Sequence, residues 1–399
     1  MAENQAIGHH PDQSFSATAG RLFSGVRPDE EVTAAATEGI IESRACVALA
    51  GRMDRVTWLI CLLLSLLGLG FASVAQLPVV QWSPWIIGIF FLVLPHGGVD
   101  DATPALLRGE GLRRRAGTGF YIWYLGLLGM VLLTWALSAN LGLLTFLFFS
   151  AYHFGQGDLY WSTIARGPAS RWSRRRSARL LYLAARGGLS VFLPFIYHDD
   201  HFRMIGERLS EQSGQTISLA LVASQYRTEL LIALGILALL HIVQIGWSAV
   251  FNRAGSTPES AADHSWRPWQ PWREVLETAL LVMLMITTPP ILSVGVYILC
   301  WHAPRHILRL MLLDPAQRRQ LASGNLRGAV ATFHRHSLAL VVVAVSILIL
   351  ISAFWLRYEL APEQLILPAF LFVNAITIPH IVTVTMLDRF QRIWRRGEQ

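Results

Sequence analysis

Long apolar stretches recur along the chain from about residue 56, and they constrain the fold more than any other feature. A stretch of roughly 18 residues or more can cross a bilayer as one α-helix. Lipid offers the backbone no hydrogen-bond partner, so spanning segments must be helices or closed barrels. Only 15% of the 399 residues are charged, against about a quarter in soluble domains. The sequence predicts an all-α, polytopic integral membrane protein.

Continuous apolar character divides this part of the chain into about ten candidate transmembrane helices. They lie at roughly 56–77, 83–104, 119–138, 141–163, 179–197, 227–250, 273–288, 290–311, 336–357 and 364–388. Residues 1–50 are polar and contain no apolar core, which is typical of a disordered tail. We therefore expect a disordered N-terminal tail at 1–50 and one transmembrane domain at 51–399.

The basic residues predict how the chain is oriented. All 33 are arginines, so a mechanism that needs a lysine Schiff base is excluded. The arginines gather in alternate loops, as in "RGEGLRRR" and "RFQRIWRR", and the intervening loops are nearly free of them. This asymmetry indicates a multi-pass protein of the inner (plasma) membrane with both termini in the cytoplasm. Basic blocks placed between apolar runs do not indicate a nucleic-acid partner.

Six histidines fall inside the predicted spans, where ionisable side chains are costly and usually mark function. They are His96, His153, His241, His302, His306 and His380. All six lie on even-numbered spans, about 12 to 16 residues from the outer end. A rise of 1.5 Å per residue places them in one layer, roughly 18 to 24 Å deep. A single buried histidine is often only a hydrogen-bonding group between helices, but a shared layer favours a common site.

One pair of these histidines has the spacing of metal ligands. His302 and His306 are four residues apart, so their imidazoles share one helical face. Asp100 follows His96 by the same spacing and is expected to hold that imidazole's second nitrogen. Asp101 and Asp158 lie near the cytoplasmic ends of their spans. They could belong to the site, but they could equally be helix caps exposed to solvent. A donor set of imidazoles suits iron, copper or zinc better than calcium or magnesium.

Four motifs resemble those of a known family. "LPHGGVDD", "YHFGQGD", "WHAPRHILR" and "IPHIVTVTMLDR" are similar, in order and spacing, to motifs of the Brp/Blh family of membrane-bound β-carotene 15,15′-dioxygenases. The similarity runs from about residue 55 to 390. It implies an Fe(2+) enzyme that splits β-carotene with O₂ at the central double bond, gives two molecules of retinal and supplies a rhodopsin.

The resemblance also implies roles for particular residues. The iron ligands of the family correspond to His96, His153, His302 and His306. His380 and Asp100 would each be a further ligand or a group that supports a ligand. His241 matches no motif, so only its depth in the membrane suggests a role. Aromatic side chains near the motifs are expected to line a substrate tunnel. These are Tyr152, Phe154, Trp301 and Phe372.

Two other classes of membrane protein use intramembrane histidines. A di-iron desaturase or hydroxylase needs about eight of them in several clusters, more than this chain offers. A haem-binding or transport protein also places histidines on facing helices. The haem protein would show a strong visible absorption band, and neither would consume a carotenoid.

Overall fold

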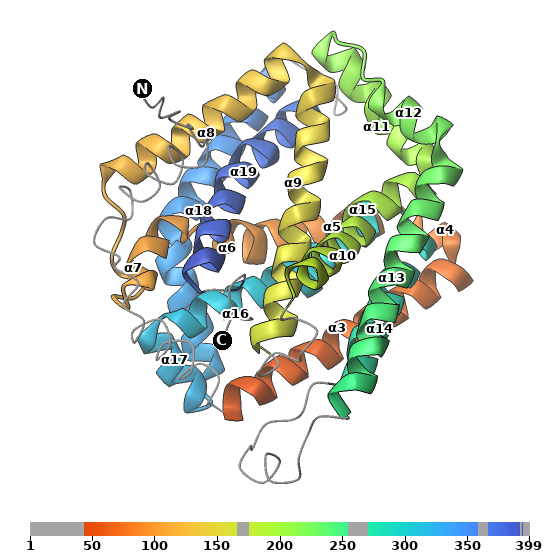
Figure 1. The fold of residues 1–399 in the computed structure, drawn as a ribbon. Helices are drawn as coiled ribbons and strands as arrows, with labels where there is room; N and C mark the ends of the chain where they lie inside the picture. The colour runs from red at the N-terminus through yellow and green to blue at the C-terminus, as the bar shows by residue number, and fades with distance from the viewer. Residues whose placement is uncertain (1–43, 166–174, 254–269, 358–365, 392, 394–399) are drawn as a thin grey trace, which may run out of the picture.

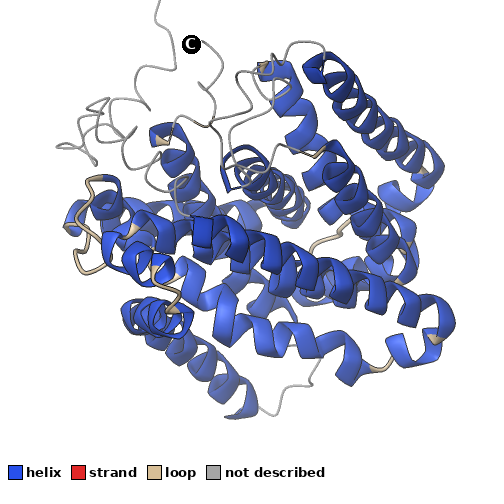
Figure 2. Cartoon of the chain, turned by 90° about the horizontal axis from the view of Figure 1, so that it is seen from below, coloured by secondary structure: helices blue, strands red, loops and turns tan. Residues whose placement is uncertain are grey.

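A computed structural model describes residues 44–165, 175–253, 270–357, 366–391 and 393. Figure 2 shows helices joined by short connections, and no strand occurs within these ranges. This architecture confirms the predicted all-α class. Residues 1–43 of the predicted tail lie outside the described part of the chain, and residues 44–50 belong to the first described helix.

Eight segments of the described chain are long and apolar enough to cross a membrane. Four are formed by single helices in the order α3 (Arg44–Gly70), α8 (Thr118–Leu137), α10 (Arg176–Tyr197) and α13 (Arg227–Arg253). Two more are α18 (Leu326–Arg357) and α19 (Ile366–Phe390). The remaining two, Pro78–Leu107 and Pro290–Leu313, are composite. The apolar surface of these helices supports a membrane location.

The expected count of ten spans was too high by this measure. All ten predicted segments are helical, but α9 (Ala139–Tyr160) and α14 (Pro271–Thr287) do not meet the length and hydropathy of a span. Helix α14 has only 17 residues, and the second half of α9 carries His153, Gln156 and Asp158. Neighbouring helices shield those polar groups, so α9 needs less apolar character than a helix that faces lipid.

The two composite spans change helical register where they approach the predicted site. The first runs through α5 (Pro78–Gly88), a π-helix (Ile89–Val93), α6 (Leu94–Gly97), a 3₁₀ turn (Asp100–Ala102) and α7 (Thr103–Leu107). The second runs through α15 (Pro290–Val296), a π-helix (Tyr297–His302) and α16 (Ala303–Leu313). Pro95 and Pro304 follow the two π-helices and lack the N–H that a regular helix would bond there. Such π segments are frequent at functional sites.

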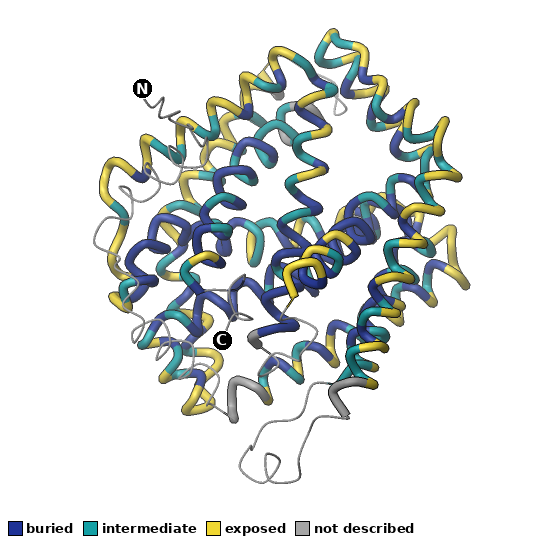
Figure 3. Tube along the Cα trace, in the orientation of Figure 1, coloured by how far each residue is buried: buried dark blue, intermediate teal, exposed yellow. Residues whose placement is uncertain are grey.

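The buried centre of the bundle is built from α9, α10, α16 and α19, whereas α8, α13 and α18 form the outside (Figures 1 and 3). Helices α9 and α10 lie backbone to backbone at Gly187, where an added Cβ would lie 1.8 Å from the carbonyl oxygen of Ala151. Small residues permit such close approach between helices in lipid. This contact fixes α9, which carries His153.

Short helices complete the described chain. They are α4 (Ala72–Ala75), a π-helix (Trp161–Ala165), α11 (Asp199–Ser213), α12 (Leu219–Gln225) and α17 (Pro315–Ala322). Helix α11, which is polar, and helix α12 form a corner at the end of α10, far from α17 in Figure 1. Helix α17 lies at the opposite side, next to α16.

Candidate metal centre

Five of the six intramembrane histidines meet at one point of the bundle. The first composite span contributes His96, α9 contributes His153 and α19 contributes His380. The second composite span contributes both His302 and His306. All five side chains are buried. Four separate stretches of chain therefore deliver imidazoles to one apolar interior, as the shared depth predicted.

The rings surround a common space. The ring centroid of His380 lies 4.7 Å from that of His96 and 5.0 Å from that of His153. The centroid of His306 lies 5.3 Å from that of His380, and that of His302 lies 4.6 Å from that of His153. All four of these pairs meet edge to face. The rings of His302 and His306, which lie one helical turn apart, are instead nearly parallel.

Three of the five histidines have ring nitrogens close enough together to bind one metal ion. One nitrogen each from His96, His153 and His380 lies within 4.8 Å of the other two. His302 joins them, because its Nε2 is 3.0 Å from Nε2 of His153. Two nitrogens bound to one cation at about 2.1 Å each are roughly 3.0 to 3.4 Å apart. The observed separation fits that range. His380 is thus as central as the four histidines that the resemblance nominated.

In His96 and His153, Nδ1 makes a hydrogen bond to a neighbouring oxygen. This leaves Nε2 of each ring free to bind a cation. His96 bonds through Nδ1 to the carbonyl of Leu92 (3.2 Å), and His153 bonds through Nδ1 to Oε1 of Gln156 (3.3 Å). An imidazole that donates through Nδ1 carries its lone pair on Nε2. Such outer bonds are the usual support of metal-binding histidines.

The strongest outer bond is made by Asp100. Both of its carboxylate oxygens contact Nδ1 of His380, at 2.9 and 3.0 Å. Nε2 of His380 is buried and has no hydrogen-bond partner among the described residues. A buried imidazole nitrogen without a partner is costly, and a bound cation would satisfy it. The hydroxyl of Tyr124 adds a weaker bond to Asp100 at 3.3 Å.

We expected Asp100 to support His96, and this partner was wrong. The α-helix ends at Gly97, and a 3₁₀ turn begins at Asp100, so the four-residue spacing does not place the two side chains on one face. Asp100 therefore reaches across to α19. The neighbouring Asp101 is also buried, but it binds Arg115 (2.6 Å) and Tyr121 (2.7 Å) instead. It is not a solvated cap.

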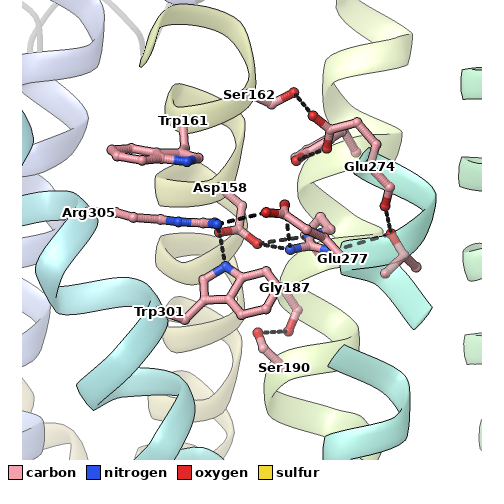
Figure 4. A network of polar contacts seen from close by, with 12 residues as sticks. Asp158, Trp161, Ser162, Gly187, Ser190, Glu274, Glu277, Trp301 and Arg305 are labelled. Carbon is pink, nitrogen blue, oxygen red and sulfur yellow. Dashed lines mark hydrogen bonds and ion pairs between the residues drawn. The ribbon is translucent and has the colours of Figure 1, made fainter. Parts of the chain in front are cut away.

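A buried ionic network lies beside the histidines (Figure 4). Arg305, between His302 and His306 in sequence, contacts Asp158 (3.1 Å), Asp54 (2.9 Å) and Glu277 (2.8 Å). The guanidinium of Arg305 lies between the indoles of Trp161 and Trp301, 5.1 and 4.6 Å from the ring centroids. One side chain thus joins α3, α9, α14 and α16.

Asp158 ties this network to α10. Its Oδ1 accepts bonds from Trp301 and Arg305, and its Oδ2 pairs with Arg186 at 2.7 and 2.8 Å. Arg186 and Asp158 are both buried. Because Asp158 follows His153 on α9 and Arg305 precedes His306 on α16, the ion pair fixes the two ligand-bearing helices together. Asp158 is not a solvated cap either.

Sequence reasoning missed most of this supporting structure. Asp54, Gln156, Arg186, Glu277 and Tyr124 were not among the predicted site residues. A charged residue in an apolar span is itself a signal of function, and Arg186 and Glu277 both lie inside predicted spans. That signal was available for these two residues. Asp54 lies just before the first predicted span, and Gln156 belongs to the motif "YHFGQGD", of which only the histidine and the aromatic residues were predicted to be site residues.

The sixth histidine lies elsewhere. His241 on α13 is fully buried, its ring meets that of Tyr182 edge to face at 4.9 Å, and neither ring nitrogen has a hydrogen-bond partner in the described chain. It makes no ring contact with the five-histidine cluster. The common depth was therefore a good guide to five positions and not to this one.

The predicted tunnel residues divide into two groups. Phe154 is buried with its ring 4.8 Å from that of His302, beside Tyr297. Trp301 instead faces the ionic network, where its indole donates to Asp158. Tyr152 on α9 and Phe372 on α19 are partly buried. Only Phe154 among the four contacts the histidine cluster through its ring.

Comparisons with known proteins agree with the geometry. The family model described as Beta-carotene 15,15'-dioxygenase matches residues 87–388, which include all five clustered histidines. The chain is 25% identical over 331 residues to a Halobacterium salinarum protein named "Probable beta-carotene 15,15'-dioxygenase Blh". That alignment covers 80% of this chain and 88% of the relative.

A second relative from the same organism is named "Probable beta-carotene 15,15'-dioxygenase Brp". It is 27% identical over 351 residues, which cover 82% of this chain and 88% of the relative. No solved structure matches the chain significantly. The family match spans most of the chain and contains the entire histidine cluster, so this protein belongs to the β-carotene 15,15′-dioxygenase family.

Proposed function

We propose that this protein is an iron-dependent dioxygenase that cleaves β-carotene at its central 15,15′ double bond and releases two molecules of retinal. The observation that carries the proposal is the cluster of five buried imidazoles, three of them with Nδ1 hydrogen-bonded to oxygen acceptors. The names of the family and of its relatives supply the substrate.

The donor set fits Fe(2+). His96, His153, His302 and His306 would hold the ion, and His380 would be the fifth ligand, with Asp100 as its support. Neutral imidazoles suit iron, copper and zinc. Bound Fe(2+) would supply the oxygen chemistry that no side chain of this cluster can perform.

The residues around the cluster would hold and orient the substrate. Two molecules of retinal contain all the atoms of one β-carotene and one O₂, so the reaction needs no proton from a side chain. The chain's task is to place the central double bond beside the cluster and to exclude water. Phe154, which contacts His302, is suited to pack against the polyene. Both substrates dissolve in lipid, so a buried site within the membrane is accessible to them.

The alternatives predict different metal contents. A di-iron desaturase or hydroxylase would bind two irons per chain, whereas one compact cluster of five histidines provides ligands for one. A haem-binding protein would show an intense visible absorption band. A transporter would need no metal. We further propose that the retinal product serves a rhodopsin in the same membrane.

Expression in a bacterium that accumulates β-carotene tests the proposal. We expect the orange colour to fade and retinal to appear in extracts. His302→Ala and His96→Ala should both keep the colour. His241→Ala is the matched control, because it removes a buried histidine outside the cluster, and it should still bleach the cells. Cells that stay orange while they contain folded, iron-loaded protein would refute the proposal.

A further inference from the structure

A small cavity lies next to the histidine cluster, between α9 and the second composite span. We call it the arginine cavity. Its walls are formed by Gly157, Asp158, Tyr160, His302, Arg305, His306 and Arg309. It has room for little more than one water-sized particle. Five of these seven residues carry charged or imidazole side chains.

Arg309 is the unusual member of this wall. Its guanidinium is 1% exposed and lies 4.1 Å above the ring of Tyr160. Nη2 donates to Asp388 (2.5 Å) and Gln391 (2.6 Å), and Nε donates to Gln391 (3.0 Å). Nη1 has no hydrogen-bond partner among the described residues. A buried, charged N–H group without an acceptor is expensive, so we expect a ligand to provide one.

Two other charged groups of this wall already have partners. Oδ1 of Asp158 accepts from Trp301 and Arg305, and its Oδ2 accepts from Nε of Arg186 and forms an ion pair with Nη2. Arg305 is occupied by its three carboxylate partners and has only donors to offer. A Cβ on Gly157 would lie 3.2 Å from Nδ1 of His302, so that edge of the imidazole faces the cavity wall.

A group on this wall that needs a partner is a charged donor, Nη1 of Arg309. A guanidinium N–H binds an anionic acceptor more strongly than a neutral one, so an anion at Nη1 would stabilise Arg309 more than a neutral ligand would. The size of the cavity selects a monatomic ion over formate or sulfate. We propose that the arginine cavity binds a chloride-sized monovalent anion through Nη1 of Arg309 and the ring edge of His302.

Such an anion has a defined structural consequence. It accepts a hydrogen bond from the outer nitrogen of His302, as Asp100 does from His380, and thereby directs the other nitrogen toward the cluster. This consequence rests on the proposed metal function, but binding of the anion does not. Chloride binding is therefore measured on metal-free protein.

The test compares sodium chloride with sodium gluconate at constant ionic strength, using the purified, metal-free full chain in detergent. We expect chloride to raise the thermal-unfolding midpoint with a saturable dependence on its concentration, because a ligand of the folded state stabilises it. Arg309→Gln should raise the half-saturating concentration by about tenfold or more. Arg335→Gln, which removes an exposed arginine on α18, should leave it unchanged.

Equal midpoints in the two salts would overturn the proposal, and so would an unchanged half-saturation in Arg309→Gln. If Arg309→Gln does not fold, the wild-type protein still decides the question. Crystals grown in bromide should show an anomalous peak within hydrogen-bond distance of Nη1 of Arg309. A cavity that contains density without an anomalous signal would assign it to water and reject the anion.

Discussion

Asp100→Asn is the sharpest perturbation of the candidate metal centre. The substitution keeps the size of the buried side chain but removes its charge and one of its two acceptor oxygens. At present both oxygens face Nδ1 of His380, at 2.9 and 3.0 Å. If the amide turns its NH₂ toward the ring, Nδ1 must accept. The proton then moves to Nε2, the nitrogen that would bind the cation.

The expected effect follows from that change of tautomer. Loss of a supporting hydrogen bond typically lowers metal affinity by about 10- to 100-fold. This corresponds to roughly 1.4 to 2.7 kcal/mol of binding free energy. We expect the upper half of this range, because the contact is made by both oxygens and is buried from water. The loss should stay below that of His380→Ala, which removes the ligand itself.

Competition of the purified protein against a ferrous chelator under anaerobic conditions measures this affinity. Asp101→Asn is the matched control. It removes the adjacent buried carboxylate, which binds Arg115 and Tyr121 and contacts none of the clustered histidines. Its affinity for Fe(2+) should equal that of the wild type. Equal affinities for Asp100→Asn and wild type, or equal losses in both Asn variants, would refute the reasoning.

Three further substitutions probe the rest of the bundle. His241→Leu should leave iron content unchanged and preserve or raise the unfolding midpoint, because it removes a buried ring whose nitrogens have no partner in the described chain; a loss of bound iron would contradict this. Arg305→Leu should lower the free energy of unfolding by about 3 to 5 kcal/mol, since three buried carboxylates lose a cationic partner. Chemical denaturation in mixed micelles measures that change, and a loss under about 1 kcal/mol would contradict the role of the network. Gly187→Ala should reduce stability and folded yield, because the α9 backbone blocks the new methyl group. Gly235→Ala on α13, where nothing lies within 4 Å, is its control.

The positions of the histidines show how far sequence reasoning reaches. Spacing along spans predicted one layer, since a helix converts residue number directly into depth. Depth does not tell which neighbouring helix a side chain faces, because that depends on how the helix is rotated about its own axis. His380 and His241 have similar predicted depths, yet only His380 faces the cluster. That distinction arises from the packing of α19 and α13.

The network around Arg305 illustrates a second limit. A charge inside an apolar stretch reveals that a partner must exist, because a lone buried charge is too costly. The sequence does not say which carboxylate supplies it. Asp54 and Asp158 are more than a hundred residues apart, and only the meeting of α3 with α9 and α16 brings both to one guanidinium.

The amino-acid sequence by itself determined that this chain is a helical membrane protein with a layer of imidazoles and a known family's motifs. These properties depend on local chemistry and on the fixed rise of a helix. The tertiary structure alone decided which five rings converge and that Asp100 supports His380. It also placed α9 inside the bundle and enclosed the arginine cavity. Rotation about each helix axis and the register breaks near Pro95 and Pro304 set those contacts, and both depend on neighbours distant in sequence.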